Sequence, residues 1–299
     1  MDGMTKKLFS PVRLLTFAAV VVVLLSVWTW WQYVYTSSNR TFWGMMDRNL
    51  MTNAYGKVVD QSVPGDQVRQ ATAIDYSSQQ RVNGQTLLNR GAGEQYTHVV
   101  TDTVGTPGTD YVRYTEIQTG QKDAEGKPLD FSQVVGVWGV ADSGSATGGQ
   151  LFGDMALGIL PVAQLNPDQR SSVMGSIRST NAYAINGVTE KRTNIFGRKS
   201  YTYDVTVHVR GYVTALKQFA LATGMKNLED VDPTTYSEDR EAKLLVTVDS
   251  WSRQVTKVEY PDSGRVEEFA GLGSLQRLNS VPEKSVTVDE LQQRLGQVR

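Results

Sequence analysis

The stretch from Leu14 to Tyr35 constrains this chain more than any other, because it has no charged residue in 22 positions. An α-helix rises about 1.5 Å per residue, so these residues would span about 33 Å, and the hydrocarbon core of a bilayer is about 30 Å thick. Its second half is rich in the aromatic residues that gather at membrane interfaces, namely Trp28, Trp30, Trp31, Tyr33 and Tyr35. The sequence therefore predicts one transmembrane helix over residues 14–35.

The charges around this helix predict its orientation. Lys6, Lys7 and Arg13 precede the apolar stretch, and the next basic residue is Arg40. Positive residues favour the cytoplasmic side of a membrane. We therefore expect a single-pass protein of the cell membrane, with residues 1–13 as a cytoplasmic stub and the C-terminal part outside the cytoplasm.

Two other interpretations of the apolar stretch remain open. A buried core helix would normally carry polar residues on one face, and this stretch does not. A cleaved signal peptide would suit the basic start and the apolar run Leu14–Val27, but bulky aromatic residues follow instead of a small-residue cleavage site. A lipid-modified N-terminus of the lipoprotein type needs a cysteine, and the chain has none.

The remaining sequence predicts a short linker, residues 36–40, and one β-rich extracytoplasmic domain, residues 41–299. Once the four charged residues of the N-terminal segment are set aside, 27 basic and 30 acidic residues remain. A nucleic-acid-binding domain would be strongly basic, so we expect no nucleic-acid partner. The absence of cysteine excludes disulfides, thiolate catalysis and zinc–thiolate sites.

Alternating and β-branched segments predict a mostly antiparallel sheet. The clearest alternation lies in 201–210, where tyrosines and valines share one face, and three hairpin-linked strands follow in 242–270. We also expect a strand over 131–140, and a turn at Asn83-Gly84 because Asn-Gly is a strong turn signal. Helical spacing predicts helices over 41–51, 166–179, 212–225 and 287–295.

The sequence offers little support for catalysis or metal binding. The two histidines, His98 and His208, lie 110 residues apart with no carboxylate at ligand spacing, so we expect no metal site and no cofactor. None of the common nucleophile, phosphate-binding or metalloprotease motifs is present. We therefore expect the domain not to be an enzyme, although a pair of carboxylates brought together by the fold would escape sequence analysis.

Two apolar segments are suited to cover the sheet, namely 151–162 and 212–225. Both contain glycine, so two interpretations stay open: they complete a solid core, or they enclose a pocket for an apolar ligand such as an acyl chain. In the second case the lining would combine both segments with the apolar face of the 201–210 strand and a tryptophan. The predicted ligand-binding residues are Trp138, Leu151, Phe152, Met155, Leu157, Ile159, Leu160, Tyr203, Val205, Val207, Leu216 and Phe219.

The order of elements resembles that of the bacterial lipoprotein-carrier superfamily, the LolA-like and LppX/LprG-like proteins. The most similar stretch is Leu244–Tyr260, a strand, a turn that contains Asp249, and a returning strand. The resemblance implies an α+β fold, with a half-barrel of antiparallel strands that holds lipid under helical covers. Those relatives are soluble or lipid-anchored, and this chain departs from them by its predicted transmembrane helix. A tethered domain cannot diffuse between membranes as a free carrier, so we expect it to hold or sense a lipid near the membrane.

The sequence thus favours a membrane-anchored domain that binds a lipid or another hydrophobic ligand between sheet and helices. The alternative is a cell-envelope scaffold or protein-interaction domain with a solid core and no ligand cavity. Trp138 and Trp251 facing solvent together would favour that alternative, in which the partner is another envelope protein.

Overall fold

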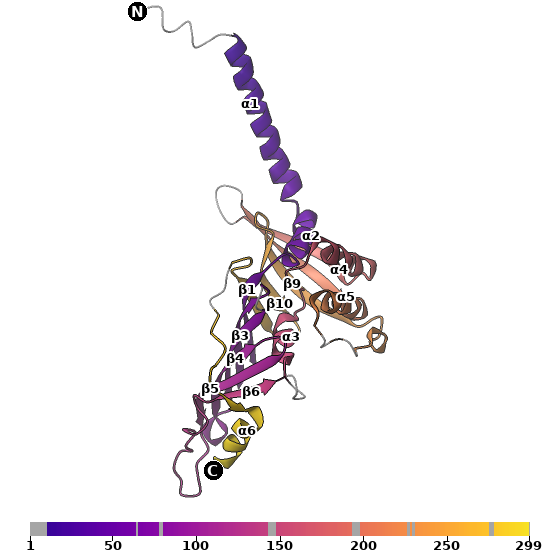
Figure 1. The fold of residues 1–299 in the computed structure, drawn as a ribbon. Helices are drawn as coiled ribbons and strands as arrows, with labels where there is room; N and C mark the ends of the chain where they lie inside the picture. The colour runs from indigo at the N-terminus through magenta and orange to yellow at the C-terminus, as the bar shows by residue number, and fades with distance from the viewer. Residues whose placement is uncertain are drawn as a thin grey trace, which may run out of the picture.

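Within its described residues the chain forms one curved β-sheet of twelve strands with helices on its concave side (Figure 1). The computed structural model describes residues 11–298 except 64, 78–79, 143–147, 193–197, 226–227, 229–230 and 275–277. A long N-terminal helix projects from one end, and the C-terminal helix lies at the other. The predicted fold class is confirmed, since the fold is α+β with an apolar N-terminal helix and an open, largely antiparallel sheet.

The strands follow one another in two groups along the chain. They are β1 (Ala54–Val63), β2 (Asp66–Asp75), β3 (Arg81–Arg90), β4 (Thr97–Gly105), β5 (Thr109–Thr119), β6 (Trp138–Asp142), β7 (Tyr183–Arg192), β8 (Lys199–His208), β9 (Glu241–Asp249), β10 (Gln254–Tyr260), β11 (Arg265–Ala270) and β12 (Val286–Thr287).

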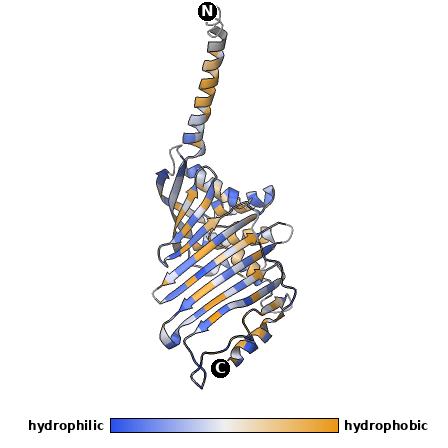
Figure 2. Cartoon of the chain, turned by 90° about the vertical axis from the view of Figure 1, so that its left-hand side faces the viewer, coloured by the Kyte–Doolittle hydropathy of each residue, from blue (hydrophilic) through white to orange (hydrophobic). Residues whose placement is uncertain are grey.

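The sheet is built from two meanders that meet at its centre. Its strand order is β12-β6-β5-β4-β3-β2-β1-β11-β10-β9-β8-β7. Strands β1 and β11 pair in the middle, and β12 and β6 form a parallel pair at one edge. Figure 2 shows the sheet from its convex side, with polar and apolar residues alternating along the strands. The alternation gives the two faces of the sheet different chemistry.

Six α-helices complete the described structure. They are α1 (Pro11–Trp30), α2 (Ser38–Asn49), α3 (Gln150–Ala156), α4 (Pro167–Ser179), α5 (Val209–Thr223) and α6 (Val288–Gln297). Local sequence signals set several of their ends. Asn166 and Gln169 form a capping box at the start of α4, and α5 ends at Gly224, which has a φ of +72°.

Helix α1 is joined to the sheet by a hydrogen-bonded junction. After α1, a π-helical turn (Trp31–Tyr35) leads into α2. The Arg253 guanidinium lies 3.9 Å from the centre of the Tyr35 ring, and its Nη2 donates to the Tyr35 carbonyl oxygen at 3.0 Å. The Tyr201 and Tyr203 hydroxyls donate to the carbonyl oxygens of Thr36 and Ser38. These bonds fix the end of α1 against β8 and the β9–β10 turn.

Gly44 in α2 makes room for this junction. A Cβ atom at this position would lie 2.6 Å from Cδ of Arg253, closer than non-bonded carbons approach. The arginine side chain therefore passes over the glycine to reach Tyr35. Helix α2 in turn packs its buried residues Phe42, Met45 and Met46 into the core beneath the sheet.

Helix α3 rests on the concave face through two strand glycines. A Cβ atom at Gly84 would lie 2.8 Å from Cε of Met155, and one at Gly105 would lie 3.0 Å from Cβ of Leu151. Side chains at either position would lift the helix off the sheet. Glycine therefore lets α3 approach the backbone of β3 and β4 closely.

Two sequence predictions about this half of the sheet are wrong. Asn83-Gly84 does not form a turn but lies within β3, where both residues are paired with β2 and β4. The strand expected over 131–140 begins only at Trp138, because residues 132–136 form turns. At Asn83-Gly84, pairing with the neighbouring strands overrode the local turn signal. Residues 132–136, in contrast, form turns although their sequence favours a strand.

We predict that Gly84→Val destabilises the fold by about 1–3 kcal/mol, the usual penalty for overpacking. The new side chain would collide with Thr103 Oγ1, 2.6 Å from the added Cβ, and with Met155. A urea titration of the detergent-solubilised chain, followed by tryptophan fluorescence, measures the change. Gly175→Ala in α4 is the control, since nothing lies within 4 Å of its Cβ and alanine favours the helix. Equal stability of Gly84→Val and the wild type would contradict this account of how α3 docks.

Candidate functional site

The concave face of the sheet is covered by α2, α3, α4 and α5, and the residues predicted to bind a ligand lie mainly there. Seven of them are buried members of one apolar core cluster: Phe152, Met155, Leu160, Tyr203, Val205, Val207 and Phe219. Four others are partly buried and pack against that cluster: Leu151, Leu157, Ile159 and Leu216. The structure thus brings eleven of the twelve predicted residues together.

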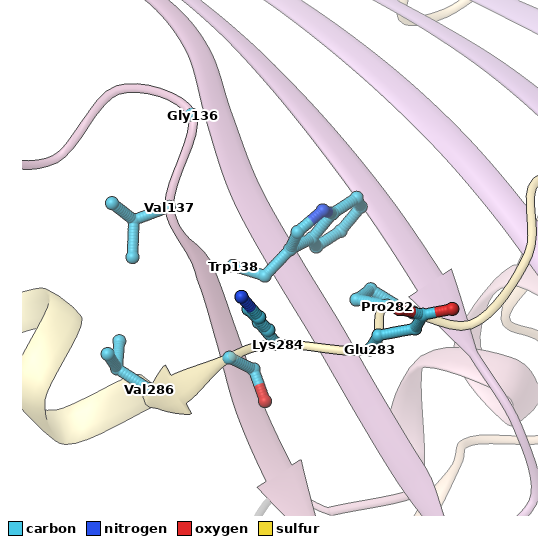
Figure 3. A pocket seen from close by; sticks show the side chains of 8 residues that line it. Gly136, Val137, Trp138, Pro282, Glu283, Lys284 and Val286 are labelled. Carbon is cyan, nitrogen blue, oxygen red and sulfur yellow. The ribbon is translucent and has the colours of Figure 1, made fainter.

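Trp138 lies apart from these eleven. It pairs with Arg113 across β5 and β6, and the Arg113 guanidinium stacks over its ring at 4.5 Å. The neighbouring Gly139 faces α6 on the concave side, so Trp138 lies on the convex side. Trp138 lines a depression of about 600 Å³. Figure 3 shows the tryptophan beside Pro282, Glu283 and Lys284, which line the same depression.

The chain segment after α3 crosses the concave face and is held there by tyrosines. The Tyr212 hydroxyl donates to the Gly158 carbonyl oxygen at 2.8 Å, and the Tyr183 hydroxyl donates to the Ile159 carbonyl oxygen at 2.6 Å. Burial raises the pKa of both tyrosines, so their hydroxyls stay protonated and keep donating at neutral pH. This segment links the cover formed by α3 to the cover formed by α4 and α5.

A cavity of about 610 Å³ lies between α3 and the C-terminal end of α5. Its apolar lining comes from Phe152 and Met225, both of which are buried members of the core cluster. Polar and small residues form the rest of the lining, namely Gln80, Pro107, Gly148, Gly149, Gln150, Gly153, Asp154, Thr223 and Gly224. The cavity therefore has a polar rim and an apolar inner wall that borders the core.

Asp110 holds the start of α3 beside this cavity. Its Oδ2 accepts hydrogen bonds from the backbone N–H groups of Gln150 at 2.9 Å and Leu151 at 3.1 Å. Burial raises the pKa of Asp110 more than these hydrogen bonds lower it. One carboxylate on β5 thus ties the short helix to the sheet.

A buried charged cluster lies on the same face, in β1 and β11. The Glu267 carboxylate accepts hydrogen bonds from Arg265 Nη2 at 2.6 Å and from the Tyr260 hydroxyl at 2.9 Å, and Lys57 Nζ lies 3.9 Å from it. Burial lowers the pKa of Lys57, although the Glu267 carboxylate partly offsets this. Burial, and then the charge of Glu267, raise the pKa of Tyr260.

This cluster holds two cations and one carboxylate on an otherwise largely apolar face. Sequence reasoning missed it, although a signal was present: Lys57 falls between Tyr55 and Val59 on the inward-facing side of its strand. Burying a charge without a partner is unfavourable. The buried Lys57 side chain has a partner, because it lies close to the Glu267 carboxylate on a strand distant in sequence.

The described residues contain no group of three or more histidine, aspartate or glutamate side chains arranged to hold a metal ion. His98 and His208 each lie beside a glutamate, Glu116 and Glu241, on different strands. Neither pair lines the cavity between α3 and α5.

Comparisons with known proteins give only distant likenesses. No protein-family model matches the sequence, and no curated protein matches it. Among solved structures, LprF from Mycobacterium bovis is similar, with a TM-score of 0.39 and 8% identity over 81% of this chain and 97% of LprF. The Pseudomonas aeruginosa MucA/MucB complex has a TM-score of 0.26 and 12% identity, over 85% of this chain and 60% of the matched chain.

Proposed function

We propose that this chain is a single-pass membrane protein whose β-rich domain lies outside the cytoplasm and binds a lipid or another hydrophobic ligand. The ligand would enter the cavity between α3 and the end of α5 and contact Phe152 and Met225. The end of the ligand that lies deeper in the core would then contact the other predicted lining residues on the concave face, Leu151 and Met155 first among them.

The exposure of the N-terminal helix supports the anchor. The window from Leu15 to Tyr35 is long and apolar enough to cross a membrane, and none of it is buried against the domain. Each square ångström of apolar surface left in water is unfavourable by about 25 cal/mol, so a bilayer is the natural surrounding for such a helix. The junction at Arg253 and Tyr35 would then hold the β8–β10 end of the sheet close to the membrane surface.

The cavity is the observation that carries the ligand proposal. Its volume of about 610 Å³ falls within the range of about 300–1,000 Å³ that is typical of small-molecule sites. It lies between the two segments that the sequence marks as covers of the sheet. Since its inner wall belongs to the apolar core, an acyl chain that displaced core side chains would exchange one apolar contact for another.

Trp138 and Trp251 do not face solvent together, which is the arrangement that would favour the scaffold alternative. Trp251 lies in the β9–β10 turn and is 37% exposed, whereas Trp138 is half-buried on β6. Six strands separate β6 from β10 in the sheet, so the two tryptophans do not form one patch. No enzymatic activity is proposed.

The anchor and its orientation can be tested with single cysteines, because the chain has none of its own. We predict that a membrane-impermeant maleimide labels Glu125→Cys, an exposed domain residue, in intact spheroplasts. Thr5→Cys, before the apolar helix, should be labelled only after lysis. Labelling of Thr5→Cys alone in intact spheroplasts would contradict the orientation, and recovery of the chain in the soluble fraction would contradict the anchor.

The ligand can be tested by filling the cavity from its wall. Thr223 lines the cavity at the end of α5, so Thr223→Phe should reduce the co-purifying lipid at least fivefold. Native mass spectrometry of the detergent-purified full chain measures bound lipid as a mass increment. Solvent extraction then identifies the molecule.

Leu221→Phe is the matched control, because Leu221 lies on the same helix and is 69% exposed, away from the cavity. This variant should retain lipid at the wild-type level. The ligand proposal would be contradicted if the wild-type protein carried no lipid, or if the two variants carried equal amounts. Neither result would contradict the proposed membrane anchor.

A further inference from the structure

The convex face of the sheet carries a second pocket, of about 490 Å³, that the proposed function does not use. Small residues on the outward side of β1, β2 and β11 form its floor, namely Gly56, Val58, Ala71, Ala73 and Ala270. Polar side chains surround this floor, namely Asn83, Gln85, Asp102, Glu268 and Asn279. The pocket lies on the opposite side of the sheet from α3, so it is separate from the cavity between α3 and α5.

Asn83 is the most informative residue in this pocket. Its side chain is only 8% exposed, yet no residue in the described part of the chain forms a hydrogen bond with its amide nitrogen or its amide oxygen. Nearly all buried polar groups in proteins are hydrogen-bonded, so an amide left without partners on both atoms indicates that something outside the chain satisfies it. A ligand that satisfies the Asn83 amide must accept a hydrogen bond from the amide nitrogen and donate one to the amide oxygen.

The neighbouring polar side chains are already oriented. Asp102 accepts from Gln85 Nε2 at 3.1 Å and from Arg113 Nη2 at 2.6 Å, so its charge is paired. Gln85 therefore keeps its amide oxygen available as an acceptor. Glu268 forms no ion pair with any described residue, and its carboxylate adds a second acceptor at the pocket's other side.

These groups restrict the chemistry of the ligand. An anion would meet the carboxylate of Glu268, which forms no ion pair with any described residue, and an acyl chain would leave the polar rim unsatisfied. A bound metal ion has no support, since no cluster of three ligating side chains occurs among the described residues. Hydroxyl groups fit best, because each hydroxyl both donates and accepts and so matches both atoms of the Asn83 amide.

We propose that this convex pocket binds a neutral, hydroxyl-rich ligand, one or two sugar units of a glycan. The hydroxyls bond to Asn83, Gln85 and Glu268, and the C–H face of the ring lies on the floor of alanine, valine and glycine. The small floor residues let a flat ring approach the sheet closely, as larger side chains would not. This gives the domain a second partner, on the face opposite its hydrophobic ligand.

Saturation-transfer difference NMR on the full chain in nanodiscs tests the proposal. The probes are neutral oligosaccharides built from hexoses, N-acetylhexosamines and pentoses, with maltotriose and tri-N-acetylchitotriose among them. Wild-type protein should transfer saturation to at least one probe. Asn83→Ala should weaken its binding at least tenfold by calorimetric titration.

Ala71→Trp provides a second variant that does not disturb the core, because Ala71 is exposed on the pocket floor. It should abolish binding by filling the pocket. Gln118→Ala, an exposed residue of β5 outside the pocket, is the control and should bind like the wild type. Transfer to no oligosaccharide, binding that survives Ala71→Trp, or selective binding of a short neutral peptide instead would each overturn the proposal. None of these results bears on the cavity between α3 and α5.

Discussion

A twelve-stranded sheet that curves without closing must cover its apolar concave side, and the rest of the structure follows from that constraint. The chain supplies the cover with four helices placed at different points in its sequence. Two strand glycines allow α3 to lie directly on the backbone, and Asp110 holds the start of that helix. A cover made of separate short pieces leaves a space where they meet, and the cavity between α3 and α5 is such a space.

The need to cover the concave side of the sheet also connects the domain to its N-terminal helix. Helix α2 is part of the cover and follows α1 almost directly, so the apolar helix ends where the core begins. Hydrogen bonds from Tyr201, Tyr203 and Arg253 satisfy the backbone carbonyls at this junction. Because these bonds come from β8 and from the β9–β10 turn, α1 leaves the domain in one defined direction, which a flexible linker would not impose.

Sequence reasoning was most successful where one periodic pattern decides the structure. The alternation in β8 and the capping signals of α4, α5 and α6 gave elements close to those observed. It failed where long-range pairing decides, as at Asn83-Gly84, a turn signal that the neighbouring strands hold in extended form. For the candidate site, the covers were predictable from composition. The meeting of Lys57 with Glu267 was not, because the two residues are adjacent only after β1 and β11 pair.

Photo-crosslinking tests the central claim, a hydrophobic ligand held between α3 and α5, most directly. The full chain in nanodiscs is incubated with a diazirine-labelled fatty acid, irradiated, digested and mapped by mass spectrometry. The account predicts crosslinks at Phe152, Met225 and their neighbours, and their loss when unlabelled fatty acid competes. Crosslinks confined to the N-terminal apolar helix would contradict it, because the probe would then have reached only the proposed membrane anchor.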